Sequence, residues 1–472
     1  ACDFTMSDLF DFDLLCIGSG PAGHRAAVQA AKLRKRAVVI ERRQCAGGVC
    51  VELGTIPSKT FREAVLSSVA SNHPFLQPVG GARVRHRPSA EKLFSRVDLV
   101  RDREIEMVEA QLWRNNIELM LGEASFKDAH TLLVTSENGT KTVTAENILI
   151  AVGTTAAPPP GIPVDGEIIL TSDEMVHLTH LPRKLVVVGG GVIGMEYASM
   201  FAALDINVTV VDKRERLLEF LDEEIVEELM HQLRNRDVTF RLGETVEKLD
   251  IPEGAFKQAV IHLESGKRIV SDMVLYSAGR IGATNGLNLE GAGLKTDSRG
   301  RIPVDQEFRT EVPHIFAAGD VIGYPSLAAT SAAQGRRAAC HAFGVNAGPM
   351  DQRFPFGIYS IPEISMIGAH EHELTENKIP YETGVARYKE IARGQILGDD
   401  SGLFKMLFHR KTRKLLGVHA IGTGATELIH IGQAVLELGG GLDYFIDHVF
   451  NYPTLAECYK VAALNAHNKL SQ

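Results

Sequence analysis

The sequence predicts an α/β protein that contains one strand-turn-helix-strand unit twice and ends in a separate α+β domain. The two units span residues 11–41 and 184–212, and each ends with a predicted strand that is rich in β-branched residues and has an acidic residue at its end. After Gly344 the pattern changes. Residues 404–422 are typical of a strand, a basic turn and a strand, and residues 425–438 have helical periodicity. We therefore expect the C-terminal domain to begin at about residue 351.

Each repeated unit contains the pattern G-x-G-x-x-G at its first turn. In such a turn the first glycine permits the tight bend, the second lets a pyrophosphate approach the backbone, and the third allows the helix to pack closely on the strand. Glu41 follows Gly18 by 23 residues, and Asp212 follows Gly189 by the same 23. An acid at this place receives ribose hydroxyls, and the matching distance argues against two ordinary strand-end acids. The pattern predicts two Rossmann-like dinucleotide-binding folds.

Composition narrows the class of protein. The 472 residues include 50 Lys and Arg against 59 Asp and Glu, a net charge of -9, which does not favour nucleic acid as a partner. No apolar run approaches the ~18 residues that a membrane span needs, and the start does not resemble a signal peptide. Six cysteines in so long a chain do not indicate a secreted disulfide framework. We expect a cytoplasmic enzyme with no membrane partner and no metal.

Two further segments place a small-residue turn after an apolar strand. They are ENILIAVGT at residues 146–154 and RTEVPHIFAAGDVIG at residues 309–323, which carries Asp320. Turns of small residues let the backbone and one carboxylate approach a ligand closely.

The ordered motifs GSGPAG, GGVC, IPSK, AVG, GGGVIGME, AGR, FAAGD and YPTLAE resemble the flavoprotein disulfide reductase family over almost the whole chain. The resemblance implies FAD on the first fold, NAD(P)H on the second, and a C-terminal domain that forms a homodimer or a higher homo-oligomer. It implies an FAD-binding domain at residues 1–155 and 285–350, an NAD(P)-binding domain at 156–284 and a dimerisation domain at 351–472.

The resemblance also implies the residues of the site. Lys59 and Glu196 would be the catalytic pair beside the flavin, where an ammonium stabilises electron density on the reduced ring. The FAD site would comprise Gly18, Gly20, Gly23, Glu41, Arg42, Gly47, Gly48, Cys50, Thr55, Lys59, Ala124, Gly153, Asp320 and Ala328. The NAD(P) site would comprise Gly189, Gly191, Gly194, Asp212, Lys213, Arg214 and Gly279.

Two departures from the family pattern bear on the chemistry. The family has a second cysteine five residues after the first and a histidine before Pro-Thr; this chain has Thr55 and Tyr452 at those places. A phenol with a pKa near ~10 is a poor base at neutral pH, where an imidazole near ~6.5 is well matched. A shifted redox pair of Cys45 and Cys50 is an alternative, but the resemblance places Cys45 away from the flavin. Cys50 is then a small residue beside the flavin rather than an electron carrier.

Without the second cysteine and the histidine, the chain lacks the groups that pass electrons to a disulfide. A second nicotinamide is then the obvious acceptor for electrons that enter from the first. GTIPSK and FNYPT, at residues 54–59 and 450–454, resemble the transhydrogenase branch of the family. This implies ping-pong hydride transfer between NADPH and NAD⁺ through flavin N5. The alternatives are a dihydrolipoamide dehydrogenase-like disulfide reductase, an NAD(P)H oxidase or diaphorase, and a nucleotide-sensing flavoprotein without turnover.

The segment VVDKRER presents signals for both nucleotides. Asp212 favours the free 2′-hydroxyl of NAD, whereas Lys213, Arg214 or Arg216 would attract the 2′-phosphate of NADP. The alternative is a solvated charged turn.

Overall fold

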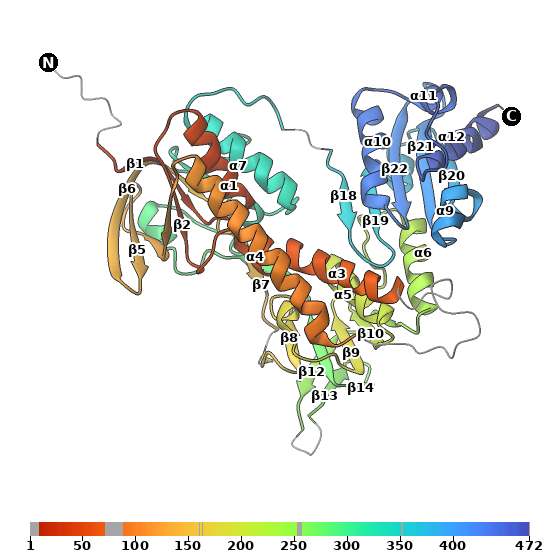
Figure 1. Ribbon diagram of the computed structural model, residues 1–472, viewed down its shortest axis with the longest axis horizontal. Coiled ribbons are helices and arrows are strands. Elements are labelled where there is room, and N and C mark those ends of the chain that lie inside the picture. Colours follow the sequence, from red (N-terminus) through yellow and green to blue (C-terminus); the bar gives the residue numbers. More distant parts are fainter. Residues whose placement is uncertain are drawn as a thin grey trace.

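The computed structural model describes residues 9–70, 88–159, 161–162, 164–252, 257–350 and 353–471; Cys2 lies outside these residues. The molecule is elongated, with the first repeated unit towards one end and the C-terminal domain at the other (Figure 1). Two sheets are wholly or mainly parallel and the C-terminal sheet is antiparallel, which confirms the predicted fold class.

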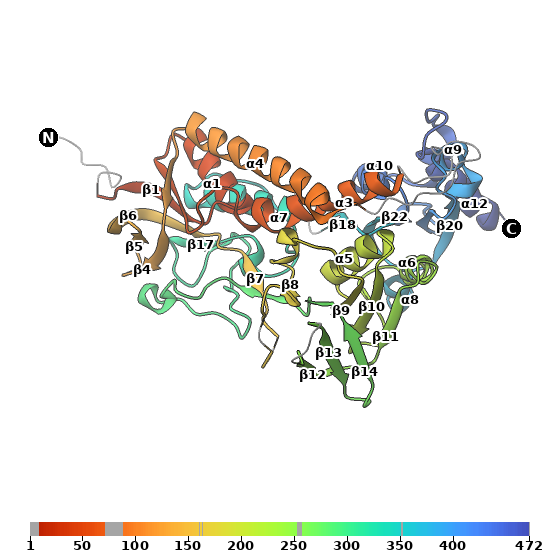
Figure 2. The same ribbon diagram turned by 60° about the horizontal axis from the view of Figure 1, so that its bottom comes forward.

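The first sheet is built around the first repeated unit. Its strand order is β3-β2-β1-β6-β5-β4, and β17 joins it beside β6. The helices α1, α4 and α7 lie on one side of this sheet (Figure 2). The bounds are β1 (Phe12–Ile17), β2 (Ala37–Glu41), β3 (Glu118–Leu121), β4 (Glu123–Phe126), β5 (Thr131–Ser136), β6 (Gly139–Ile150), β17 (Ile315–Ala317), α1 (Pro21–Lys32), α4 (Ala90–Arg114) and α7 (Ala328–Ala342).

The second sheet contains the second repeated unit. Its order is β11-β10-β9-β15-β8, with parallel pairing throughout. A three-stranded antiparallel sheet, β12-β13-β14, belongs to the same part of the chain. The bounds are β8 (Ile169–Thr171), β9 (Lys184–Val188), β10 (Asn207–Asp212), β11 (Thr239–Leu242), β12 (Val246–Asp250), β13 (Ala259–Leu263), β14 (Arg268–Ser271), β15 (Met273–Tyr276), α5 (Val192–Ala203) and α6 (Glu223–Arg234).

A five-stranded sheet forms the C-terminal part, in the order β18-β19-β22-β21-β20 with antiparallel neighbours. The strand, basic turn and strand predicted at residues 404–422 are β21 and β22, and the predicted helix is α10. The bounds are β18 (Phe356–Ile358), β19 (Ile364–Gly368), β20 (Tyr381–Arg387), β21 (Leu403–His409), β22 (Leu415–Ile421), α8 (Glu371–Glu376), α10 (Ala425–Glu437), α11 (Leu442–Asp447) and α12 (Glu457–Leu470).

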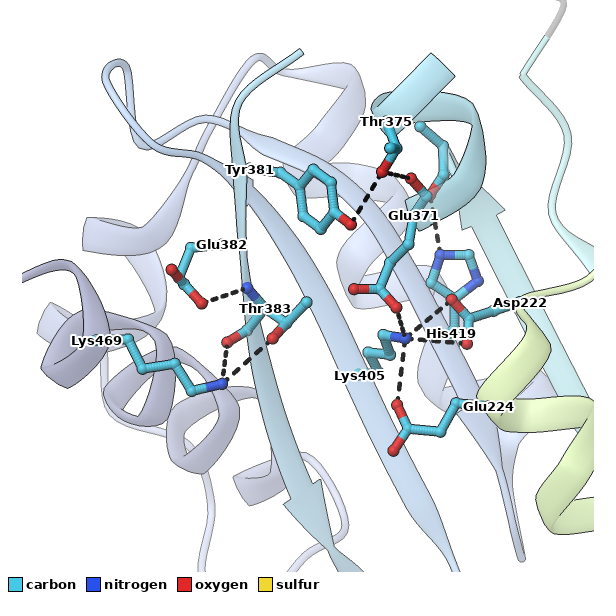
Figure 3. Close-up of polar contacts among 11 residues, drawn as sticks. Asp222, Glu224, Glu371, Thr375, Tyr381, Glu382, Thr383, Lys405, His419 and Lys469 are labelled. Atoms are coloured by element: carbon cyan, nitrogen blue, oxygen red, sulfur yellow. Dashed lines mark hydrogen bonds and ion pairs between the residues drawn. The ribbon is translucent and has the colours of Figure 1, made fainter. Parts of the chain in front are cut away.

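A buried lysine joins the C-terminal sheet to the second repeated unit. Lys405 on β21 has a side chain that is only 2% exposed, and its Nζ lies 3.0 Å from a carboxylate oxygen of Asp222, the N-cap residue of α6. The ammonium also contacts Glu224 and Glu371 (Figure 3). Since a buried charge is tolerated only with such partners, this cluster ties the two parts of the chain together.

None of the described helices is both long and apolar enough to cross a membrane. The domain boundaries given above remain a prediction.

Candidate active site

The first glycine turn leaves open space in front of a helix. A Cβ on Gly18 would lie 2.4 Å from the carbonyl oxygen of Ala151, and one on Gly23 would lie 1.9 Å from that of Gly18, so both positions require glycine. A Cβ on Gly20, the N-cap of α1, would meet no described atom within 4 Å. No described side chain caps this helix. Its first N–H groups are therefore available to an anion such as a pyrophosphate, as the predicted FAD site requires.

The loop at residues 46–54 packs directly on this turn. The Gly47 N–H donates to Ser19 Oγ at 2.9 Å, and a Cβ on Gly48 would lie 2.9 Å from the Cα of Gly20. Glu41 is buried, and its Oε2 accepts the Ser19 N–H at 3.0 Å and the Ser19 O–H at 2.6 Å. The structure thus brings these predicted residues together around Ser19, which the sequence analysis did not single out.

Cys50 lies in the short helix α2 (Gly48–Glu52), just before α3 (Thr55–Ala70). Burial raises the pKa of the Cys50 thiol, and a hydrogen bond with the Thr55 side chain acts in the opposite direction. The residue that stands at the second cysteine position of the family therefore contacts the first one. The thiols of Cys45 and Cys50 are both free in the described part of the chain.

Lys59 on α3 forms an ion pair with Glu196 on α5, in the second repeated unit. Lys59 Nζ lies 2.8 Å from Glu196 Oε2 and 3.0 Å from Oε1. The Glu196 side chain is 4% exposed and the Lys59 side chain 26%. A chelating carboxylate restricts where the ammonium can stand, because both of its oxygens contact the same nitrogen. The structure therefore brings together the two residues, 137 positions apart, that the family resemblance pairs.

Asp320 is a carboxylate with few partners. Burial raises its pKa, while a hydrogen bond from Ser331 and the charge of Arg280 act in the opposite direction. Ser331 Oγ lies 3.3 Å away. A partly buried carboxylate with one such partner retains acceptor sites for hydroxyl groups, as a ribitol chain provides. Asp320 and the turn at Gly20 therefore fit FAD by their own chemistry.

The remaining predicted FAD residues are placed as follows. Gly153 has φ +67, and a Cβ there would have no described atom within 4 Å, so this turn is also open. Ala124 is buried in β4, Ala328 is the first residue of α7, and Arg42 is exposed after β2.

The second glycine turn repeats the geometry of the first. A Cβ on Gly194 would lie 1.9 Å from the carbonyl oxygen of Gly189, whereas one on Gly191 would meet no described atom within 4 Å. The Gly190 N–H donates to Asp212 Oδ2 at 2.7 Å, as the Ser19 N–H donates to Glu41. In both units the terminal acid thus fixes the glycine turn.

Gly279 lies at the turn that leaves β15. It is exposed, with φ +133 and space for a ligand beside it.

Asp212 is already paired with a cation in this structure. Arg214 donates through Nε to Oδ1 at 2.9 Å and through Nη2 to Oδ2 at 2.7 Å. Burial alone would raise the pKa of Asp212, but the hydrogen bonds from Arg214 and the Gly190 N–H outweigh it and lower that pKa. Lys213 is exposed, and Arg216 pairs with Glu223 instead. Asp212, which the sequence predicts to favour NAD, and Arg214, which it predicts to favour NADP, therefore form one ion pair.

Two further residues hold the site, and the sequence analysis assigned neither. Arg280, the last residue of the quoted AGR motif, donates to Thr154 Oγ1 and to Asp173 Oδ1, both at 2.9 Å. Arg280 therefore connects the segment after β15 in the second sheet to Thr154, which follows β6 in the first sheet. Tyr359 donates its backbone N–H to Glu196 Oε1 at 2.9 Å. No motif in the sequence marks that contact, because the donor is a backbone group.

Comparisons with known proteins agree with this arrangement. The profile of the pyridine nucleotide-disulphide oxidoreductase family matches residues 12–335, and that of the dimerisation domain of the same family matches residues 354–463. A soluble pyridine nucleotide transhydrogenase of Mycobacterium bovis is 51% identical over 98% of both chains. The protein of that name from Salmonella gallinarum is 43% identical over 98% of this chain and 100% of its own.

Solved structures give the same fold. The flavoprotein disulfide reductase RclA of Escherichia coli, described as HOCl-induced, has a TM-score of 0.86 at 26% identity and covers 96% of this chain and 99% of its own. LpdA of Mycobacterium tuberculosis has a TM-score of 0.87 at 26% identity with the same coverage.

Proposed function

The chain belongs to the pyridine nucleotide-disulphide oxidoreductase family, and on that premise we propose that it catalyses NADPH + NAD⁺ ⇌ NADP⁺ + NADH. Full-length relatives 51% and 43% identical carry the name soluble pyridine nucleotide transhydrogenase. One observation carries the proposal. The chain keeps two open glycine turns and the Lys59–Glu196 pair, while Thr55 contacts Cys50 where a thiol relay needs a second cysteine.

The family implies FAD, which when bound supplies a two-electron carrier between the two nicotinamides. The chain's own residues do the rest. The N-terminus of α1 and the loop at Gly48 would bind the pyrophosphate, and Asp320 would accept hydroxyl groups. Glu196 holds the Lys59 ammonium in one place, so that its positive charge would be available to the flavin without rearrangement. Catalysis is therefore mainly alignment, and no side chain needs to transfer a proton.

The second glycine turn binds NADPH and NAD⁺ in alternation. With Arg214 on Asp212, the acid is neutralised and a 2′-phosphate can approach. The guanidinium has further N–H groups that can donate to the phosphate while it stays on Asp212. With NAD⁺, Asp212 accepts the free 2′-hydroxyl. One pair of side chains thus serves both nucleotides.

We also propose a homodimer formed through residues 351–472, with the domain boundaries given above. The family match to a dimerisation domain supports this assembly. Large apolar side chains are exposed on this part of the chain, including Val449 at 93%, Leu438 at 88% and Tyr452 at 73%. Exposed apolar side chains of this size are candidates for burial against a partner.

The test is anaerobic mixing of the FAD-loaded protein with NADPH and an NAD⁺ analogue of distinct absorbance. We expect rapid reduction of the analogue and parallel lines in double-reciprocal plots. A strict requirement for both nucleotides to bind together would contradict the ping-pong scheme. Turnover of a dithiol or of oxygen in place of the analogue would favour a disulfide reductase or an oxidase.

The variant Glu196→Gln tests the catalytic pair separately. Loss of the buried carboxylate removes the chelating partner of Lys59, and we expect hydride transfer to fall by about tenfold or more with FAD retained. Unchanged transfer would remove Glu196 from the mechanism.

A further inference from the structure

We propose that Tyr359, which the C-terminal part of the same chain supplies, is a positioning residue that holds the Lys59 ammonium in place through its ring face and backbone. The inference deepens the proposed function, because it assumes that Lys59 lies beside the flavin. It assigns to the dimerisation domain a direct part in tuning the redox site of its own chain.

Tyr359 contacts both members of the ion pair. Its N–H donates to Glu196 Oε1 at 2.9 Å, and Lys59 Nζ lies 5.0 Å from the centroid of its ring. The face of an aromatic ring attracts a cation at this distance. Lys59 therefore has a carboxylate and an aromatic face as partners, although its side chain is 26% exposed and would otherwise be free to turn towards water.

The segment that carries Tyr359 is fixed from both sides, one helical turn beyond each member of the pair. On α5, Ser199 lies three residues after Glu196, and its Oγ accepts the Ile361 N–H at 2.9 Å. On α3, Arg62 lies three residues after Lys59, and its Nε donates to the Ser360 carbonyl at 3.0 Å. Residues three apart share a helix face, so each helix presents one member of the pair and one anchor for this segment to the same side.

A second ion pair reinforces the anchor on α3. Arg62 Nη2 lies 3.4 Å from Glu363 Oε2, and both side chains are only 8% exposed. Ser360, Ile361 and Glu363 are buried, and contacts to both helices hold the segment in place. These contacts fix the position of the Tyr359 N–H that donates to Glu196. The ring acts separately, because its face attracts the Lys59 ammonium.

The ring itself is held at its far end. The Tyr359 hydroxyl interacts with the side chain of Thr426, at the start of α10, and burial raises the pKa of Tyr359. The phenol is therefore neutral at physiological pH. Because α10 belongs to the C-terminal domain, a displacement of that domain would move the ring relative to Lys59.

The midpoint potential of bound FAD tests the role. An ammonium held beside the ring favours the reduced form, so a mobile ammonium makes reduction less favourable. We expect Tyr359→Phe to keep the wild-type potential, since phenylalanine presents the same aromatic ring face to Lys59. We expect Tyr359→Leu to lower the equilibrium constant for reduction by about tenfold, a shift of about 30 mV to more negative potential.

Two controls separate positioning from general structure. Tyr381→Leu, on β20 in the C-terminal sheet, should leave the potential unchanged. In a Lys59→Met background, Tyr359→Leu should cause no further shift, because the ring acts through the ammonium. A wild-type potential in Tyr359→Leu, or an equal shift in the Lys59→Met background, would overturn the proposal.

If Tyr359→Leu does not retain FAD, the comparison is between phenylalanine and pentafluorophenylalanine incorporated at position 359. The two side chains have nearly the same shape, but fluorination reverses the charge of the ring face. We expect a more negative potential for the fluorinated ring, and an unchanged potential would overturn the proposal. Failure of the nucleotide-mixing experiment, by contrast, would refute transhydrogenation and leave this result standing.

Discussion

Arg214 closes on Asp212 with two hydrogen bonds, Nε to Oδ1 at 2.9 Å and Nη2 to Oδ2 at 2.7 Å. The pair thus links the carboxylate that would accept the 2′-hydroxyl of NAD to the guanidinium that would attract the 2′-phosphate of NADP. Because Asp212 also accepts the Gly190 N–H, the pair is continuous with the glycine turn that approaches the pyrophosphate. A change in Arg214 should therefore alter the choice of nucleotide more than the turnover.

We expect Arg214→Ala to raise the KM for NADPH by about tenfold and that for NADH much less, because an uncovered Asp212 repels a 2′-phosphate. Adding Lys213→Ala should widen the difference. Steady-state kinetics with each nucleotide measures it, and Lys248→Ala on β12, where the exposed lysine pairs with Asp250, is the control. Equal losses for both nucleotides would refute the assignment.

We expect Cys50→Ser to retain FAD and most of the hydride transfer. Burial raises the pKa of the Cys50 thiol, so it is protonated at neutral pH and reacts slowly as a nucleophile. Iodoacetamide labelling followed by peptide mass analysis should show slow modification of Cys50 at pH 7. Abolished transfer with FAD still bound would mean that the sulfur has a redox role.

We expect Lys405→Met to lower the free energy of unfolding by about 3–5 kcal/mol, since it leaves the buried carboxylate of Asp222 without its cation. Neighbouring carboxylates outweigh the effect of burial and raise the pKa of Lys405. Its contribution is therefore complete at neutral pH and is lost only as pH rises above the ordinary lysine value, through the raised one. Thermal unfolding measures the change, with the exposed Lys248→Met as control. The double variant with Asp222→Asn should recover part of the loss; no recovery would contradict the pairing.

We expect stability to fall as pH drops below about 6.5, in part because of His24. Burial lowers the pKa of His24 to about 4, and its Nε2 is buried with no hydrogen-bond partner among the described residues. Between pH 6.5 and 4 the His24 imidazole is protonated in the unfolded chain but neutral in the folded chain. This residue therefore lowers the free energy of unfolding by up to about 1.4 kcal/mol for each pH unit in that range. Urea unfolding at pH 7, 6 and 5 should show a shallower decline for His24→Gln. An identical decline would assign the effect elsewhere, for instance to His419, whose pKa burial also lowers to about 4.

The glycine turns were predictable because their physics is local. A Cβ on Gly23 would meet the carbonyl oxygen of Gly18, a requirement that follows from one strand, one turn and one helix, and Gly18 itself has a positive φ of +104. The Ala151 carbonyl that also excludes a Cβ at Gly18 is not local, because it comes from the segment after β6. Local structure also places the acid at the end of the second strand. In parallel neighbouring strands, the turn after β1 and the end of β2 meet at one edge, so Glu41 reaches Ser19.

The partners that hold Lys59 were not predictable from local pattern. Glu196 was paired with it only through family resemblance, and Tyr359 contributes a backbone donor that no residue type signals. Lys405 looks like an ordinary residue of strand β21, and its burial depends on acids from α6 and α8. Each of these contacts joins segments more than 30 residues apart.

By itself, the sequence determined two dinucleotide-binding folds and a separate α+β C-terminal domain, and its ordered motifs resemble a family whose usual thiol pair it lacks. The two folds follow from spacing within single units, where covalent connection keeps the partners close. Only the tertiary structure decided that Arg214 neutralises Asp212, that Thr55 contacts Cys50, and that Tyr359 completes the surroundings of Lys59. The reason is that side-chain direction and burial depend on how separate elements pack, and packing brings together residues that no interval in the chain relates.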